Sequence, residues 1–354
     1  MFDSGSLFWL IFLGTYVVCV WALIALSRKH RSPRVAGLLI ATCSLLTLFG
    51  IAEVAFRIRH LYWRDIPWFS GMAWSDDQEL GWAGTLVEPP SASGKKILFL
   101  GDSFTAGMGV AMQDMYYAVS ARELGASAYA YAAPGYGTWQ EALALRRLIG
   151  QIEPELIVLQ VCSNDLINNY WQLERDSLHQ RVLRPRPYWE NGVSVQHMPR
   201  SGGWIRLFLA QHSRVFHFIF IHEEKLMLRL AKLGWASSIE DKMNADPNLP
   251  ALQEARMVTE EILLQMKSFA GNVPIIAFMV DEAEPALGIL KKAFAAVDIP
   301  LHESGIKALR RASQKETFAA FRLEDGVHLN AMGNAVFGKA IAKTIARSES
   351  SEPR

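Results

Sequence analysis

Two stretches of the sequence carry residue types suited to nucleophilic catalysis. In ILFLGDSFTAGMGV, residues 97–110, an apolar run ends in a glycine that Asp102 and Ser103 follow. In LEDGVHLNAMGNAVFGKAIAKTIA, Asp325 stands three residues before His328 in a polar turn that precedes a helical pattern. A serine hydroxyl becomes an effective nucleophile when a histidine takes its proton and a carboxylate orients that histidine. Ser103, His328 and Asp325 are therefore the candidates for such a site.

The elements around Ser103 decide whether it can act. Short apolar runs alternate with a helical pattern along the chain: KKILFL (95–100), SAYAYAA (127–133), the helical TWQEALALRRLIG (138–150), ELIVLQV (155–161) and VPIIAFMV (273–280). Such alternation predicts a parallel sheet with helices on both faces. The ligand crevice of such a sheet lies at the carboxyl ends of the strands, which is where Ser103 is delivered. By itself the Asp-x-x-His spacing favours a surface turn that caps the next helix, and the strand-end serine shifts the balance toward catalysis.

Two further strand ends could supply hydrogen-bond donors to an oxyanion. In APGYGTW, Gly135 lies between a predicted strand and a predicted helix, where the missing side chain lets its N–H approach a substrate oxygen. In VCSNDLINN, Asn164 follows the third predicted strand and carries an amide that can donate to the same oxygen. Each residue taken alone is more typical of a turn or a helix cap.

Together the stretches GDSFT, APGYG, CSND and DGVH resemble, in the same chain order, the motif blocks of the SGNH hydrolases, the GDSL-type esterase superfamily. The resemblance covers roughly residues 95–346. It implies a three-layer α/β/α, flavodoxin-like parallel sheet and a serine hydrolase that acts on ester bonds. It also implies that the reaction needs no cofactor and no metal.

The resemblance assigns a role to each matching residue. Ser103 would be the nucleophile, His328 the general base and Asp325 the residue that orients it. The backbone N–H groups of Ser103 and Gly135 and the side-chain amide of Asn164 would form the oxyanion hole.

One position departs from the family pattern. Cys162 stands where the family usually has glycine, directly before Ser163 and Asn164. A side chain at this position could crowd the crevice or shift Asn164, which puts the donor role of Asn164 in question. Asp102 in such motifs is a structural hydrogen-bonding group rather than a catalyst.

Composition limits the classes of partner. The 354-residue chain has 36 Lys and Arg against 35 Asp and Glu, a formal net charge of +1. A nucleic-acid-binding protein normally carries a clear basic surplus, so nucleic acid is not expected as a partner. Three widely spaced cysteines, Cys19, Cys43 and Cys162, form neither a disulfide framework nor a metal signature.

Residues 1–60 are predicted to form a two-helix transmembrane hairpin. LFWLIFLGTYVVCVWALIAL (7–26) is long enough to cross about 30 Å of hydrocarbon, and VAGLLIATCSLLTLFGIA (35–52) is slightly shorter. Glu53, directly after the second run, would lie near the interface. A cleaved signal peptide is the alternative, but it would need positive charges before a shorter apolar core, and here they come after it.

Positive charge predicts the orientation of this hairpin. SRKHRSPR (27–34) separates the two runs, and the residues before the first run carry no Lys or Arg. The positive-inside rule places that loop in the cytoplasm, which makes the chain a membrane-anchored, multi-pass inner-membrane protein of bacterial type with an extracytoplasmic catalytic domain. Arg57, Arg59 and Arg64 follow the second run and compete with the loop in this rule.

The rest of the chain is predicted to be one domain with an insertion. A juxtamembrane linker at 61–94 precedes the hydrolase domain at 95–346, and 347–354 is a polar, disordered tail. About a hundred residues separate the third and fourth predicted strands, too many for an ordinary connection, so a mostly helical insertion is expected at about 166–265. Within it, residues 204–234 fit an amphipathic helix that covers the sheet, or that forms a lid or lies on a bilayer.

The fold alone does not choose the substrate. An anchored domain outside the cytoplasm favours O-acetyl ester cleavage or transfer on a cell-envelope or exported glycan, and a membrane acyltransferase is a possible partner. A lipid-directed esterase, a polysaccharide O-acetyltransferase and a non-catalytic glycan-binding protein remain alternatives. Tryptophans that could stack on sugars or fill the core stand at positions 74, 82, 139, 171, 189 and 204.

Overall fold

The structure is a computed structural model that describes residues 4–29, 32–62, 76–90, 94–107, 109–179, 184–199, 202–314 and 316–351. The chain divides into two compact units, Met1–Met72 with Ile205–Glu223 and Ala73–Trp204 with Glu224–Arg354. The first unit holds the N-terminal helices, and the second holds the β-sheet.

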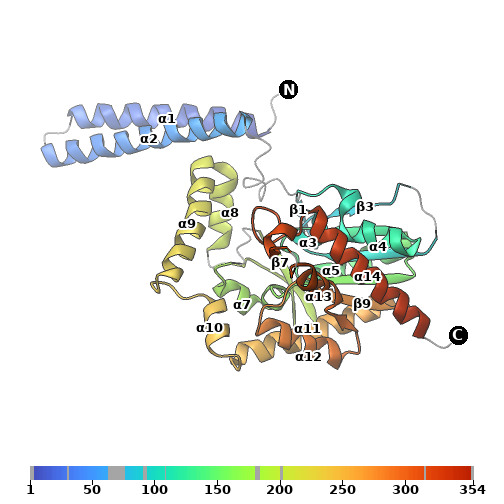
Figure 1. Cartoon of the computed structure of the whole chain (residues 1–354). Coiled ribbons are helices and arrows are strands. Elements are labelled where there is room, and N and C mark those ends of the chain that lie inside the picture. Colours follow the sequence, from blue (N-terminus) through green and yellow to red (C-terminus); the bar gives the residue numbers. More distant parts are fainter. Residues whose placement is uncertain are drawn as a thin grey trace. The chain divides into compact units, whose positions relative to one another are not determined.

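The first unit contains two N-terminal helices, α1 (Ser4–Lys29) and α2 (Pro33–Tyr62), which lie side by side (Figure 1). Ring atoms of Tyr16 approach Gly50 so closely that a Cβ on that glycine would lie 3.1 Å from them. Among the described residues, one helix is long and apolar enough to cross a membrane, Pro33–Ile58. The segment expected to be a transmembrane hairpin thus forms two helices, and its crossing of a membrane stays a prediction.

The first unit also takes Ile205–Glu223 from two further helices, α8 (Gly203–His212) and α9 (Arg214–Lys232). The sequence predicted one helix here, whereas the structure has a junction at Ser213. The Ser213 hydroxyl accepts the N–H of Phe216 at 3.2 Å, and a serine in this position caps the start of a helix. This side chain therefore begins a new helix inside the predicted one.

The second unit is built on a six-stranded sheet of order β10-β9-β6-β4-β5-β3. The strands are β3 (Thr85–Val87), β4 (Lys96–Gly101), β5 (Ser127–Ala132), β6 (Leu156–Val161), β9 (Ile275–Met279) and β10 (Leu301–His302). β3 is antiparallel to β5, and all other pairs are parallel. Without β3 the order is that of flavodoxin-like folds, whose ligand crevice lies at the carboxyl ends of the strands where the connection changes direction. The prediction of a flavodoxin-like α/β fold is confirmed.

Both faces of this sheet are buried, because side chains alternate between the faces along each strand. On β4, Leu98 and Leu100 belong to one hydrophobic cluster, while Ile97 and Phe99 belong to another. All four side chains are fully buried. Burial on both faces explains why the central strands are nearly continuous apolar runs in the sequence.

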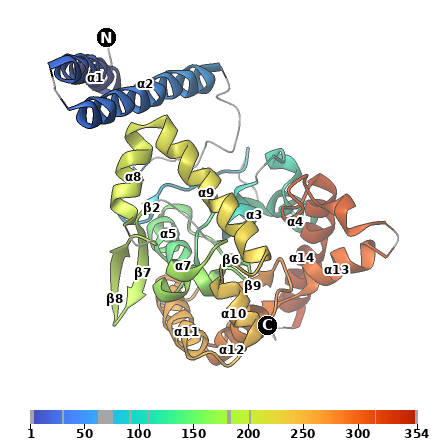
Figure 2. The ribbon, with the colours of Figure 1, turned by 90° about the vertical axis from the view of Figure 1, so that its left-hand side faces the viewer.

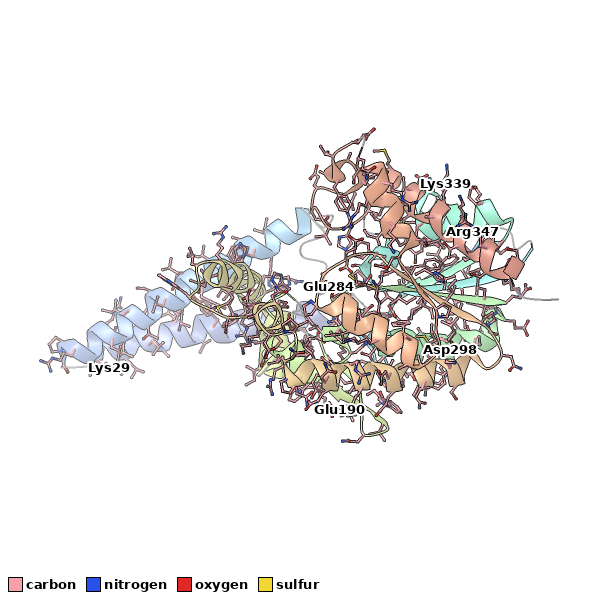
Figure 3. All side chains as sticks on the ribbon, turned by 60° about the horizontal axis from the view of Figure 1, so that its bottom comes forward. Lys29, Glu190, Glu284, Asp298, Lys339 and Arg347 are labelled. Carbon is pink, nitrogen blue, oxygen red and sulfur yellow. The ribbon has the colours of Figure 1, made fainter. Side chains whose placement is uncertain are left out.

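Helices on the two faces complete three layers (Figure 1). One layer contains α5 (Thr138–Ile152), α11 (Pro250–Ala270) and α12 (Ala286–Ala296), and the other contains α4 (Tyr116–Leu124), α13 (Ser304–Ala312) and α14 (Ala331–Ser351). Figure 3 shows Lys339 and Arg347 on α14 across the sheet from Asp298, which follows α12.

The segment between β6 and β9, predicted to be a mostly helical insertion, also contains two strands. β7 (Arg186–Glu190) and β8 (Val193–His197) form an antiparallel hairpin near α5 and near α7 (Trp171–Asp176) (Figure 2). The remaining short elements are β1 (Asp76–Asp77), β2 (Gly81–Trp82), α3 (Ser103–Ala106), η2 (Met112–Asp114), α6 (Asp165–Asn168), α10 (Ile239–Ala245) and η3 (Phe318–Phe321).

The segment expected to be a linker at 61–94 contributes to the folded domain. Its residues Thr85–Val87 form β3, the edge strand of the main sheet. Leu80 and Trp82 are fully buried in the core. A run rich in Trp, Gly and Pro shows no periodicity, which is why the sequence does not predict this strand.

The prediction of a disordered tail at 347–354 is wrong for residues 347–351, because α14 continues to Ser351. The side chains of Ile341 and Ile345 are buried and hold the helix on the domain. Glu349 pairs with Lys95, so the last turn of the helix also has a partner. A polar sequence at the end of an anchored helix thus extends that helix.

Close packing of α14 against α4 should make Gly338 intolerant of a side chain. A Cβ there would lie 2.6 Å from the Tyr116 carbonyl oxygen and 2.9 Å from Val119 Cβ. We expect Gly338→Ala to lower the free energy of unfolding by about 1–3 kcal/mol, measured by urea denaturation.

Gly150→Ala on α5 is the matched control, since nothing lies within 4 Å of the added Cβ. Alanine in a helix should raise the free energy of unfolding there by about 0.5–1 kcal/mol. Equal unfolding free energies for the two variants would contradict the packing of α14 on α4.

Candidate active site

Ser103 occupies the first position of α3, directly after the central strand β4. Asp102 caps this short helix, since one of its carboxyl oxygens accepts the N–H of Phe104 at 3.0 Å. The turn requires glycine at position 101, because a Cβ there would lie 2.2 Å from Thr105 Oγ1. These local contacts hold the Ser103 hydroxyl at the carboxyl edge of the sheet.

The structure brings the three predicted triad residues together. His328 Nε2 lies 2.8 Å from Ser103 Oγ, although 225 positions separate these residues in the sequence. His328 Nδ1 lies 2.5 Å from Asp325 Oδ2. When Nδ1–H donates to the carboxylate, Nε2 is free to accept the serine proton. The arrangement can therefore activate the Ser103 hydroxyl for attack on a carbonyl carbon.

A tight loop between η3 and α14 presents Asp325 and His328 on the same side. Asp325 Oδ1 accepts the N–H of Val327 at 2.8 Å and that of His328 at 3.0 Å. Gly326 has a φ of +72°, in the left-handed region that glycine adopts readily. The Leu323 N–H donates to the His328 carbonyl at 2.8 Å and closes the loop. The carboxylate is thus fixed by the loop that carries it.

The same contacts set the charge of Asp325. Partial burial alone would raise the pKa of this carboxyl, but the His328 imidazole and the N–H groups of Val327 and His328 lower the pKa below its usual 3.8. Because the pKa is lower in the folded than in the unfolded chain, the ionised group stabilises the fold at neutral pH. That contribution is lost as the pH falls through the folded pKa. Because this pKa lies far below 7, the orienting carboxylate is charged at neutral pH.

Gly135 lies in the turn after β5 with a φ of +78°, a conformation that favours glycine. Its carbonyl accepts a hydrogen bond from Arg186 Nη2. Within the part of the chain that the structure describes, the N–H groups of Ser103 and Gly135 have no hydrogen-bond acceptor. Two of the expected oxyanion donors are therefore available to a ligand.

Asn164 directly precedes α6, near the end of β6, and its side-chain amide contacts that of Asn168 at 2.8 Å. The surroundings of Asn168 are best satisfied when its oxygen accepts from Arg186 Nη1 at 2.9 Å and its nitrogen donates to the Asn164 backbone carbonyl at 3.2 Å. Asn164 is thus linked through Asn168 to the same arginine that holds Gly135. Its donation to an oxyanion stays a prediction.

Cys162, the departure from the family pattern, is a buried core residue. It belongs to a hydrophobic cluster with Phe104 and Val280. Its thiol donates to Asp281 Oδ2 at 3.4 Å, and Asp281 also accepts the Ser163 N–H at 3.0 Å. Burial raises the pKa of the Cys162 thiol well above its usual value, so it stays protonated and is a poor nucleophile.

Sequence reasoning missed three charged residues that support the site. Arg186 and Glu174 form an ion pair at 3.0 Å with both side chains fully buried. Burial raises the pKa of Glu174, and Arg186 opposes that shift. Neither residue belongs to a motif, so no signal marked them. Asp281 stands just after the apolar run VPIIAFMV, and the strand-end rule that selected Ser103 could have selected it as well.

Comparison with known proteins agrees with this fold and geometry, which define a serine hydrolase that acts on esters. The model of the GDSL-like lipase/acylhydrolase family matches residues 97–341, and the chain belongs to this family. No curated protein matches the chain.

Several solved structures are similar to the chain at low identity. A lipase/acylhydrolase from Enterococcus faecalis shares 14% identity over 72% of this chain and 97% of its own, with a TM-score of 0.38. The psychrotrophic esterase EstA from Pseudoalteromonas sp. shares 7% identity over 73% of this chain and 100% of its own, with a TM-score of 0.38. An acetyl xylan esterase from Butyrivibrio proteoclasticus shares 10% identity over 74% of this chain and 66% of its own, with a TM-score of 0.38.

The contact between Asp325 and His328 predicts a large loss of activity for Asp325→Asn. An amide in place of the carboxylate no longer fixes the proton on Nδ1, so we expect kcat for ester hydrolysis to fall by about four orders of magnitude. Glu324→Gln, at the exposed neighbouring position, is the control and should keep kcat within about twofold. Similar kcat values for both variants would show that Asp325 does not orient the histidine.

Proposed function

We propose that this protein is a serine esterase that cleaves O-acetyl esters of a cell-envelope or exported glycan, or transfers the acetyl group between glycans. One observation carries the catalytic part of the proposal, the continuous chain of hydrogen bonds from Ser103 Oγ through His328 to Asp325. Within the described residues, the N–H groups of Ser103 and Gly135 donate to no protein acceptor, and this supports the same chemistry because an oxyanion needs donors beside the nucleophile.

The reaction follows from these contacts. Ser103 Oγ attacks the ester carbonyl carbon while His328 Nε2 takes the hydroxyl proton. The carbonyl oxygen becomes an oxyanion and accepts hydrogen bonds from Ser103 and Gly135 N–H, and from Asn164 if its amide turns toward it. His328 returns the proton to the departing alcohol oxygen, which leaves Ser103 acylated. Water or a second hydroxyl then attacks the acyl group, again with His328 as base, and restores the serine.

The choice of a glycan ester rests on where the domain would work. α2 is long and apolar enough to span a membrane, and Arg28 and Lys29 at the end of α1 favour a cytoplasmic loop between the helices. The second unit would then lie outside the cytoplasm, anchored in the inner membrane, where envelope and exported polysaccharides carry acyl groups. A membrane acyltransferase would be a suitable partner for supplying or removing those groups.

The tryptophans offer limited sugar-stacking surface. Trp82 and Trp139 are buried in the core, as is common for this residue. Trp171 and Trp189 are partly exposed, and Trp204 is exposed, so of the predicted positions within the described residues these three are open to a ligand. Position 74 lies outside the described residues.

Removing the nucleophile tests the catalytic proposal directly. Ser103→Ala should lose all labelling by a fluorophosphonate and at least about a thousandfold in kcat/KM, because no group remains to form the acyl-enzyme. Asn164→Ala should lose about a hundredfold if its amide is an oxyanion donor. Ser313→Ala, at the residue that follows α13, is the control and should label like the wild type. Labelling of Ser103→Ala at the wild-type rate would refute the assignment.

A panel of esters separates the alternatives for the substrate. A glycan O-acetyl esterase should prefer acetylated polysaccharide and short acyl esters to long-chain esters. Preference for long acyl chains would favour a lipid-directed esterase, and transfer to a glycan that exceeds hydrolysis would favour an O-acetyltransferase. A wild-type protein that is not labelled by the fluorophosphonate and hydrolyses no ester would favour the non-catalytic glycan-binding function.

A further inference from the structure

Glu53 is a carboxylate within the mostly apolar helix α2. It lies inside the candidate span Pro33–Ile58, five residues or about 8 Å before its end, and the residue is 3% exposed. A buried charge is costly unless hydrogen bonds compensate for the lost water. The contacts of Glu53 therefore show what surrounds this end of α2.

Arg57, one turn further along α2, pairs with Glu53 at 2.9 Å, and the start of α9 supplies the other contacts. Glu53 accepts the Ser213 hydroxyl at 2.7 Å, the Arg214 N–H at 2.9 Å and the Val215 N–H at 3.0 Å. The first N–H groups of a helix have no acceptor within the helix, and in an apolar surrounding they find no water either. The carboxylate and the helix start satisfy each other, as two polar groups must where a bilayer excludes water.

Aromatic contacts on either side of Glu53 extend this junction along α2. The rings of Phe49 and Phe216 are 5.6 Å apart, and those of Phe56 and Phe218 are stacked at 4.5 Å. Both α2 residues belong to the candidate span. The first turns of α9 therefore pack against residues that would lie at bilayer depth.

The chain folds back at the junction and exposes apolar side chains. Arg206 on α8 pairs with Glu223 on α9 at 2.6 Å, although 17 residues of straight helix would cover about 25 Å. Ile205, Phe208 and Ile219 on these helices are 68%, 56% and 46% exposed. The two helices thus form a hairpin with apolar side chains that nothing in the first unit covers among its described residues.

We propose that the hairpin of Ile205–Glu223 is a membrane-interface element that lies at the boundary of headgroups and acyl chains, with Ile205, Phe208 and Ile219 in contact with lipid. Lipid is the occupant because the hairpin is bonded to α2 within the span, so its neighbours at that depth are acyl chains. Amphipathic helices with exposed aromatic and aliphatic side chains lie in this zone. The inference does not depend on the esterase activity.

Spin-label accessibility in proteoliposomes tests this placement. The full chain, with its native cysteines replaced, carries one nitroxide at Phe208→Cys or at Val193→Cys on β8, whose native side chains are equally exposed at 56%. We expect collision with oxygen to exceed collision with a water-soluble nickel chelate at position 208, and the reverse at position 193. Leu48→Cys on α2, where the native side chain is 63% exposed, reports whether the span itself contacts lipid.

Each other outcome overturns the proposal. A label at 208 that prefers the nickel chelate while 48 prefers oxygen shows that the span holds and the hairpin lies in water. A label at 208 shielded from both reagents shows protein contact, such as a second copy of this chain. Water exposure at both 208 and 48 shows that α2 does not cross the bilayer.

Removal of the Glu53 carboxylate tests the junction separately. Glu53→Leu keeps an apolar span but leaves the N–H groups of Arg214 and Val215 without their acceptor. Their hydrogen exchange should accelerate about tenfold, while exchange in α14 stays unchanged. Unchanged exchange at both amides would show that Glu53 does not hold the hairpin.

A different observation concerns the buried Arg186 of β7. Its Nη2 donates to the Gly135 carbonyl, and its Nη1 donates at 2.9 Å to the Asn168 oxygen in the amide orientation that satisfies both Asn168 atoms. In that orientation the Asn168 side-chain nitrogen donates to the Asn164 backbone carbonyl at 3.2 Å. Glu174 pairs with Nη1 of the same guanidinium at 3.0 Å. One side chain thus braces two of the three groups expected to bind the oxyanion.

We infer that Arg186 is a positioning residue that aims the oxyanion donors, an inference that rests on the proposed esterase function. Fixing the Gly135 carbonyl fixes the left-handed conformation of this residue, and with it the direction of its N–H. A donor that is already aimed stabilises the transition state without reorganisation. The planar fork of arginine can reach several acceptors at once, which lysine cannot do.

Arg186→Lys tests this role with Arg184→Lys as the matched control. Arg184 is also buried, but it pairs with Asp76 instead of the site. We expect kcat of Arg186→Lys on a short-chain ester to fall about 10- to 100-fold with KM within about threefold, and Arg184→Lys to stay within about twofold. Free guanidinium should restore part of kcat to Arg186→Ala but none to Ser103→Ala.

The outcomes separate this inference from the function it rests on. Wild-type kcat in Arg186→Lys, or a loss confined to thermal stability and KM, would refute positioning while the esterase function stands. A wild type without any ester turnover would refute the function itself. If Arg186 variants fail to fold, Glu174→Gln, which keeps the arginine, should show a smaller loss in kcat, and an unchanged kcat would count against the inference.

Discussion

The hydrogen bond between Ser103 and His328 is the constraint on which the rest of the structure depends. Such a bond tolerates only about half an ångström of variation in distance. Its two partners nevertheless come from near the beginning and near the end of the domain's sequence. One partner is fixed by β4 and the capped turn after it, and the other by the loop before α14. That loop keeps its place because α14 is packed on α4 with glycine at position 338. Packing far from the reaction thus sets the reacting distance.

The supporting charges follow a different rule from the triad. A fully buried ion pair such as Arg186 with Glu174 adds little or nothing to stability, because both groups lose their water. The pair instead fixes the orientation of neighbouring groups, since the guanidinium holds the Gly135 carbonyl and contacts the Asn168 amide. The insertion that carries this arginine therefore contributes to the structure of the active site.

The insertion contributes to both units of the chain. Its helices α8 and α9 meet at Ser213, where Glu53 of α2 accepts hydrogen bonds from the start of α9. A charged residue in an apolar helix and a helix start without acceptors are each unfavourable alone. They become compatible when each satisfies the other, which is why a single carboxylate can organise this part of the structure.

The sequence by itself determined the four central strands, the order of the motif blocks, and Ser103, His328 and Asp325, because these signals are local: an apolar run, a turn and a short spacing. It missed β3, the end of α14, the junction at Ser213 and the bracing by Arg186. Those features depend on what a segment meets after folding, and no pattern within the segment records its partner. Tertiary structure alone decided that two residues 225 positions apart lie 2.8 Å from each other, since only the packed sheet and helices bring them there.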